Sequence, residues 1–191
     1  MSELVSGEKW YRHFTTFERT ARRLEVRDAY AKPEENADFR RFLRGEDDPD
    51  YGHKLSDWTD EVIRPAVAVG KRFERVRVVR QPPTDYQRFG LRGARYNVEA
   101  GEDFRYLLRQ HLAGLHLPDY DYWLFDEQLL ALYHFTDTAE VLGVHLITAP
   151  AVVRQHRAWL DTAWRAATPY QDFAAQHPAW ALPGPSADGA G

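Results

Sequence analysis

The sequence predicts an α/β or α+β fold, in which helices from both chain ends pack on a central, mostly antiparallel sheet. Two observations predict this class. Apolar side chains recur at helical spacing in residues 8–27 and again in residues 152–167, near the two ends of the chain. Between them, residues 74–80, 122–126 and 129–135 are rich in β-branched and aromatic side chains, as strands are. The 191 residues are 43% apolar, which is enough for one core.

The first part of the chain is predicted to be helical. Apolar residues at steps of three and four predict an amphipathic helix over residues 8–27. A shorter helix is expected over residues 36–44, with Gly45 as its stop. Residues 57–69 predict a third helix, which Pro65 is expected to kink or divide.

The middle of the chain begins with a basic strand. Residues 74–80 alternate arginine with valine, so a strand here places charges on one face, away from the core. After a proline turn, residues 84–89 predict one or two helical turns, with a further bend marked by Gly90 and Gly93. Residues 104–111 are expected to form another helix, because their apolar positions share a stripe.

The last part of the chain predicts a meander followed by a helix. Residues 122–126 and 129–135 are expected to form a hairpin around a two-residue turn, and residues 141–148 a third strand. The apolar stripe that begins near Pro150 predicts a long closing helix, which ends before Pro169.

Three parts are expected along the chain. Residues 1–52 are predicted to be an N-terminal helical segment packed on the core, residues 53–170 the α/β core with its closing helix, and residues 171–191 a flexible tail. No run approaches the ~20 apolar residues of a membrane-spanning helix. The chain has no cysteine, which fits a reducing compartment. We therefore expect a soluble, cytoplasmic protein.

The distribution of charge limits the class of partner. The net charge of −4 disfavours direct nucleic-acid binding, which needs a basic surface. Eight Lys/Arg and two acidic residues lie between Lys71 and Arg95, whereas seven acidic residues and one Lys lie between Glu46 and Glu61. These two blocks can pair with each other, face solvent or bind a partner.

An arginine-rich face is the candidate ligand site. Guanidinium groups bind phosphate or carboxylate through two parallel hydrogen bonds, which lysine cannot reproduce. We expect a small anionic ligand here, with pairing to nearby acidic residues as the alternative. The candidate ligand-binding residues are Arg75, Arg77, Arg80, Tyr86, Arg88 and Arg105.

Carboxylates near glycine and turn positions suggest an alternative, catalytic function. Glu99, Glu102 and Asp126 are the candidate acid/base residues of an enzyme that acts on a phosphorylated, nucleotide or aminoacyl substrate held by the arginines. The two glutamates can equally cap a helix or pair with arginine. The eight histidines show no zinc-binding spacing, so we expect no metal and no cofactor.

Several segments resemble a known family. They are residues 17–24, 75–79, 86–89, 99–105 and 122–126. With these segments the chain resembles the actinobacterial family of domain of unknown function 6879 over most of residues 10–170. Such proteins are commonly encoded beside helix-turn-helix regulators. The resemblance therefore implies a non-enzymatic regulatory or accessory module with such a regulator as its protein partner, and it implies no catalytic residue.

Overall fold

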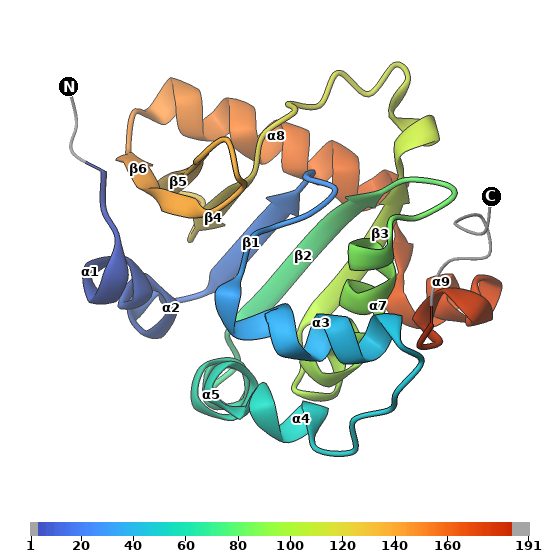
Figure 1. The fold of residues 1–191 in the computed structure, drawn as a ribbon. Coiled ribbons are helices and arrows are strands. Elements are labelled where there is room, and N and C mark those ends of the chain that lie inside the picture. Colours follow the sequence, from blue (N-terminus) through green and yellow to red (C-terminus); the bar gives the residue numbers. More distant parts are fainter. Residues whose placement is uncertain (1–3, 185–191) are drawn as a thin grey trace.

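The computed structural model describes residues 4–184 (Figure 1). The strands are β1 (Thr20–Glu25), β2 (Arg72–Val79), β3 (Asp103–Leu108), β4 (Tyr122–Phe125), β5 (Leu129–Phe135), β6 (Val141–Ile147) and β7 (Thr168–Pro169). The longer helices are α3 (Asn36–Leu43), α7 (Asp85–Glu99), α8 (Pro150–Ala166) and α9 (Tyr170–Gln176). Short helical segments complete the fold: α1 (Gly7–Tyr11), α2 (His13–Thr16), η1 (Pro33–Glu35), α4 (Tyr51–Lys54), α5 (Ser56–Trp58), η2 (Thr59–Ile63), α6 (Arg64–Ala68), η3 (Arg109–Leu112) and η4 (Pro178–Ala181).

The strands form one mixed sheet in the order β6-β5-β4-β1-β2-β3-β7. β1, β2 and β3 run parallel to one another, and every other neighbouring pair is antiparallel. The predicted class, a mostly antiparallel central sheet with helices packed on it, is confirmed. Within residues 4–184, no helix is long and apolar enough to cross a membrane.

Each face of the sheet is covered by different helices. In Figure 1, α8 crosses behind the sheet, whereas α3, α5 and α7 lie in front of it. On the α8 face, Leu24, Val76 and Leu124 pack with Leu160 of α8. The opposite face is more aromatic and includes Trp123. Because successive side chains of a strand alternate between faces, this arrangement decides which arginines are buried beneath α7 and which face α8.

The predicted helix over residues 8–27 is wrong in its second half. α1 and α2 end by Thr16, and residues 20–25 form β1 in the centre of the sheet. Ala21 and Leu24 do recur at helical spacing, but they point to opposite faces of the sheet, and both faces are covered. β1 carries charged side chains on both faces, Arg22 towards α8 and Arg23 with Glu25 towards α7, so no single polar face marks its period of two.

Two further predictions for the middle of the chain are wrong. Gly90 and Gly93 do not mark a bend but lie inside α7. A Cβ on Gly90 would lie 3.3 Å from Nη1 of Arg77, so the glycine permits close approach of that guanidinium group to the helix. Residues 103–108 form strand β3 instead of a helix, with Phe104 on the α7 face and Leu107 on the α8 face.

Other predicted elements are confirmed with small shifts in their ends. The helix at 36–44 is α3, the basic strand is β2, and the meander is β4, β5 and β6. The predicted two-residue turn between β4 and β5 is instead a three-residue loop, because Phe125 pairs with Leu129 and residues 126–128 lie between them. Asp126 and Glu127 in this loop have positive φ. The predicted division at Pro65 is also found, because η2 is a π-helical segment directly before α6, whose first turn contains this proline. α8 matches the predicted closing helix.

The two ends of the chain differ from the expected three-part organisation. β1 joins residues 20–25 of the predicted helical segment 1–52 directly to the central sheet. Residues 170–181, within or next to the predicted flexible tail, form α9 and η4 because Phe173 is buried against Tyr106, with ring centroids 4.7 Å apart. The rest of the predicted tail, from residue 185, lies outside the described residues.

Candidate ligand-binding cavity

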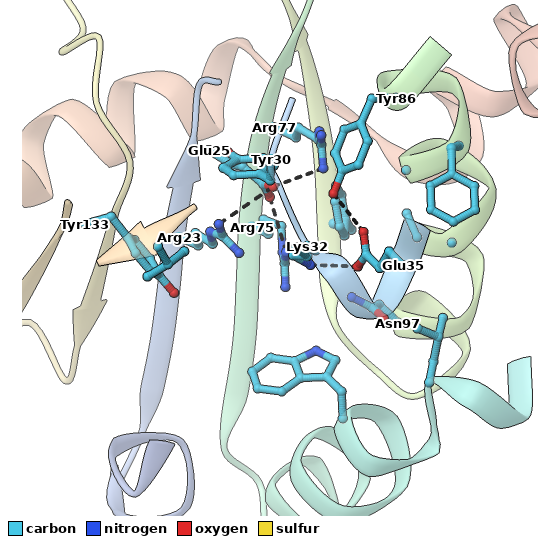
Figure 2. Close-up of a pocket in the computed structure, with 18 of the residues that line it drawn as sticks. Arg23, Glu25, Tyr30, Lys32, Glu35, Arg75, Arg77, Tyr86, Asn97 and Tyr133 are labelled. Carbon is cyan, nitrogen blue, oxygen red and sulfur yellow. Dashed lines mark hydrogen bonds and ion pairs between the residues drawn. The ribbon is translucent and has the colours of Figure 1, made fainter. Parts of the chain in front are cut away.

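A cavity of about 360 Å³ lies between the α7 face of the sheet and the segments that cover it. Strands β1 to β5 supply its floor. α7, the segment around residues 30–35, and α4 and α5 supply its walls. Figure 2 shows Tyr133 on one side of the cavity and Asn97 on the other, with Arg75 and Lys32 between them. The volume is at the small end of the roughly 300–1,000 Å³ that small-molecule pockets occupy.

The floor carries three arginines that the strand register brings together. β1 and β2 are parallel, with Arg23 opposite Arg75 and Glu25 opposite Arg77. All four side chains point to the α7 face, since they occupy alternate positions on neighbouring strands. The sequence predicts that the guanidinium groups of Arg75 and Arg77 face away from the core. They are buried instead, because α7 and the segment before α3 cover that face of the sheet. Arg75 and Arg77 are only 8% and 6% exposed.

Glu25 is the centre of this arginine cluster. Its carboxylate accepts hydrogen bonds from Nη1 of Arg77 at 3.0 Å and from Nη1 of Arg75 at 3.2 Å, and Nη2 of Arg23 lies 3.7 Å away (Figure 2). Burial raises the pKa of Glu25, but the charges of the three arginines outweigh burial and hold the pKa well below its usual range. Glu25 is therefore a permanent anion in this site.

Two further carboxylates lie behind the floor. Glu102 binds Arg75 through both oxygens, at 2.7 Å to Nε and 3.3 Å to Nη2, and also accepts from Nδ2 of Asn97 at 2.8 Å. Asp121 is fully buried, lies 3.5 Å from Nη2 of Arg23, and accepts a short hydrogen bond from the hydroxyl of Tyr30. Burial raises the pKa of Asp121 despite the charge of Arg23.

Aromatic rings surround the guanidinium groups. The guanidinium carbon of Arg77 lies 5.6 Å from the ring centroid of Tyr30 and 5.8 Å from that of Tyr86. Arg75 lies 5.5 Å from the Trp123 ring, and Arg23 lies 5.3 Å from the Tyr133 ring. Such cation–π contacts hold the planar guanidinium groups in place. Ten of the residues that line the cavity are aromatic: Phe14, Tyr30, Tyr51, Trp58, Tyr86, Phe89, Phe104, Trp123, Tyr133 and Phe135.

A second polar cluster lies at the edge of the cavity. Nζ of Lys32 lies 2.8 Å from one oxygen of Glu35, and the Tyr86 hydroxyl donates to the other at 2.8 Å (Figure 2). Burial and the charge of Glu35 raise the pKa of Tyr86, so this hydroxyl stays protonated and acts as a donor. Lys32 and Glu35 are only partly buried, and Glu35 ties the segment before α3 to the first turn of α7 through Tyr86.

Several buried donors around the floor have no hydrogen-bond acceptor within residues 4–184. They are Nε and Nη2 of Arg77, Nε of Arg23 and the indole nitrogen of Trp123. A buried donor without a partner costs free energy, and most buried polar groups are satisfied. The arginine cluster therefore has more donors than its three carboxylates use.

The structure separates the six predicted ligand-binding residues into two groups. Arg75, Arg77 and Tyr86 line the cavity. Arg80 does not: its side chain is 55% exposed, and Nη1 lies 4.0 Å from Asp28.

Arg88 and Arg105 also lie away from the cavity. Arg88 is buried at the other side of α7, where it donates to the backbone oxygens of Leu182 and Gly184 at 2.8 and 2.7 Å. Arg105 points to the α8 face and lies 4.0 Å from the ring of Trp164. Both arginines hold parts of the fold together, on opposite sides of the sheet from each other.

The three predicted acid/base residues do not come together. Glu99 lies at the exposed end of α7, with Arg95 3.7 Å away. Glu102 is held by Arg75 behind the cavity floor. Asp126 lies in the β4–β5 turn, where its carboxylate accepts from the backbone N–H groups of residues 18, 19 and 20 at 2.8, 2.7 and 2.9 Å. None of the three lines the cavity.

Sequence reasoning missed several cavity residues. Arg23 and Glu25 lie in the segment that was predicted to be helical, and Tyr30, Lys32 and Glu35 lie in the connection that follows. A signal was present for the first two, because Arg23 and Glu25 alternate with the buried Leu24. Residues 4–184 contain no group of three or more His, Cys, Asp or Glu residues that could hold a metal ion.

Comparison with known proteins identifies a family. No match is found among the curated proteins. The family model described as "Domain of unknown function (DUF6879)" matches residues 8–175, a span that includes the whole of the cavity. The chain therefore belongs to the DUF6879 family.

Proposed function

We propose that this protein is a binding module whose cavity holds a small anionic ligand. The supporting observation is the floor of the cavity, where three arginines lie side by side on two parallel strands; Arg75 and Arg77 are buried, and Arg23 is partly buried. Of the charged residues that line the cavity, Arg23, Lys32, Arg75 and Arg77 are cationic, and only Glu25 and Glu35 are anionic. The lining residues therefore favour an anion, and guanidinium groups suit a carboxylate or a phosphate.

The geometry supports binding better than catalysis. Glu25 is the carboxylate nearest the arginines, but their charges keep its pKa low, so it is a poor acceptor for a substrate proton. Glu35, the other lining carboxylate, already binds Lys32 and Tyr86. The described lining residues include no Ser, Thr, Cys or His that could act as a nucleophile or base. A non-enzymatic role is therefore part of the proposal.

We propose a regulatory role, which the family resemblance implies. In that role the cytoplasmic module would bind its ligand and contact a protein partner of the helix-turn-helix class. The segment between β1 and α3 suits such a coupling, because Tyr30, Lys32 and Glu35 reach into the cavity from a connection at the surface. A ligand that contacts these side chains would change the surface offered to the partner.

The test is a thermal unfolding screen of the full chain against nucleotides, sugar phosphates, mono- and dicarboxylates and divalent metals, at constant ionic strength. A ligand at a hundredfold excess over Kd stabilises the folded state by about 2.7 kcal/mol. For a chain of this size we expect Tm to rise by roughly 5–10 °C with at least one class of anion.

Arg77→Lys is the variant that assigns a shift in Tm to the cavity. It keeps a positive charge near Glu25 but removes the guanidinium donors, so the ligand-induced rise in Tm should disappear. Arg105→Gln is the matched control, because Arg105 lies on the α8 face, away from the cavity. If Arg77→Lys does not fold, Arg75→Lys replaces it. A panel without any shift, or a shift that Arg105→Gln also removes, would contradict the proposal.

A further inference from the structure

The cavity also limits the chemical class of its ligand, and this inference rests on the proposed function. We infer that the ligand is a planar aromatic molecule carrying a single negative charge, as in an aromatic carboxylate. The inference depends on three properties of the cavity: the rings that form its walls, the balance of charge around its floor, and its volume.

The walls favour a planar ring. Of the ten aromatic residues around the cavity, Trp58, Tyr86, Tyr133 and Phe135 are only partly buried, so part of each side chain is open to contact. They come from three different elements, α5, α7 and β5, and Figure 2 shows Tyr86 and Tyr133 on opposite sides of the cavity. Rings offset-stacked or edge-to-face against these walls gain contact energy that a saturated group of the same size does not.

The charges favour a single negative charge on the ligand. The four cationic lining residues face Glu25 and Glu35 in the cavity, with Glu102 and Asp121 directly behind the floor. Because burial raises the pKa of Asp121, the cluster is balanced when Asp121 is ionised and carries one positive charge when it is protonated. A monoanion can use the surplus donors of the arginines and leaves at most one negative charge in excess. A dianion would leave one or two negative charges in excess in a partly buried site, where desolvation is expensive.

The volume favours a small ligand. About 360 Å³ is the space of roughly twelve waters at ~30 Å³ each. That space suits one or two fused rings with an acidic group. A nucleotide carries a phosphate with up to two charges, which the balance of charge around the floor disfavours.

The experiment is isothermal titration calorimetry of the full chain with three probes of matched size. They are 2-naphthoate, its fully saturated decahydro analogue, and 2-naphthyl phosphate. We expect 2-naphthoate to bind about tenfold more tightly than the saturated acid, which corresponds to one or two ring contacts. We also expect it to bind about tenfold more tightly than the phosphate, because the phosphate carries the second charge.

Variants assign the ring preference to the walls. Tyr133→Leu should reduce the difference in affinity between 2-naphthoate and the saturated acid from about tenfold to less than about threefold. Trp58→Leu serves the same purpose if Tyr133→Leu does not fold. Tyr120→Leu is the control, because Tyr120 contacts His156 of α8, away from the cavity. In this control, the affinity of 2-naphthoate relative to the saturated acid should match that of the unaltered chain.

The possible outcomes separate this inference from the proposed function. Equal affinity for the saturated acid overturns the aromatic preference, and tighter binding of the phosphate overturns the single charge; in both cases an anion-binding cavity remains. Failure of all three probes, while another anion shifts Tm through Arg77, overturns this inference alone. Failure of every anion in both experiments overturns both conclusions.

Discussion

Glu25 compensates the arginines of the cavity, although it lies in a segment that the sequence predicts to be helical. It is 3% exposed and lies between guanidinium groups from two strands. Removing one member of a buried ionic cluster leaves the others uncompensated, and the loss exceeds the net contribution of the intact pair. The loss of stability on substituting Glu25 therefore measures how much of the positive charge of the arginines this one carboxylate compensates.

Glu25→Gln should lower the free energy of unfolding by about 3–5 kcal/mol. Urea denaturation at pH 7 measures the loss. Glu18→Gln is the matched control, because the Glu18 side chain is exposed, and a change within about 0.5 kcal/mol is expected. A loss below about 1 kcal/mol for Glu25→Gln would show that other groups or solvent compensate the arginines.

The same variant should change the response to acid. The pKa of Glu25 is lower in the folded state than in the unfolded chain, where it is about 4.3. Its contribution to stability is therefore full above about pH 5 and is lost as pH falls towards the folded-state pKa. The unaltered chain should lose stability steeply below about pH 4, and Glu25→Gln less steeply. If the free energy of unfolding falls with pH equally in the two proteins, Glu25 is not the source of the acid sensitivity.

Asp126 illustrates a residue whose chemistry is structural. Its carboxylate accepts three backbone N–H groups at the start of β1, and these bonds keep its pKa low although burial acts in the opposite direction. The same two oxygens cannot also serve as a general base without releasing these groups. The sequence suggested an acidic side chain with a function, and the structure shows that its partners are the backbone of residues 18–20.

Among the helices, α7 contributes most to the cavity. Tyr86, Gly90, Gly93 and Asn97 follow one another at steps of three or four, so they share one face of this helix and line the cavity. The glycines let Arg77 and Tyr51 approach the helix closely. The sequence predicts turns at glycines in general, but inside a helix a glycine can instead make room for a neighbouring side chain.

The start of α7 is set by a capping box. The hydroxyl of Thr84 accepts from the backbone N–H of Gln87 at 3.1 Å, and Oε1 of Gln87 accepts from the backbone N–H of Thr84 at 3.1 Å. Both side chains also reach the segment after β1, because the Thr84 hydroxyl donates to the backbone oxygen of Asp28, and Gln87 donates to its carboxylate. The capping box thus fixes α7 against the segment that covers the cavity.

Thr84→Ala should destabilise the protein by about 1–2 kcal/mol, because it removes the cap and the bond to Asp28. Chemical denaturation measures the change. Thr162→Ala is the control, since the Thr162 hydroxyl donates to a backbone oxygen one turn earlier in α8 and accepts only a long, exposed bond from Arg165. We expect this variant to be within about 0.5 kcal/mol of the unaltered chain. An equal effect of the two substitutions would contradict the role given to the capping box.

At the scale of the whole molecule, the described residues beyond α8, up to residue 184, belong to the folded structure. β7 pairs with β3 at the edge of the sheet, and α9 places Phe173 against Tyr106. Arg88 of α7 holds the following segment through the backbone oxygens of Leu182 and Gly184. Tail-like composition near the C-terminus therefore does not mark the end of the packed structure.

Phe173→Ala should reduce the free energy of unfolding by about 3 kcal/mol, because Phe173 is 2% exposed and its ring stacks on a buried tyrosine. Leu182→Ala is the control near the same end of the chain. Leu182 is 59% exposed, and its substitution should change stability by less than about 0.5 kcal/mol. A small loss for Phe173→Ala would indicate that α9 contributes little to the core.

The local patterns of the sequence predict much of the fold but only part of the cavity. The β4–β5 hairpin, β6, the basic strand β2 and helix α8 follow from local periodicity and turn residues, and Arg75, Arg77 and Tyr86 were predicted as ligand residues. β1 and β3 were mistaken for helices, because apolar residues in both segments also recur at steps of three and four. The carboxylate partner of the arginines was missed together with β1.

The sequence by itself determined the mixed α/β class, the closing helix and the arginines of β2, since each depends on neighbouring residues in the chain. Only the tertiary structure decided that Arg23 and Glu25 stand opposite Arg75 and Arg77, about fifty residues away along the chain. That register comes from the parallel pairing of β1 with β2, and a pairing of distant strands leaves no periodic signal in either segment. The cavity exists because this pairing and α7 enclose the arginines between them.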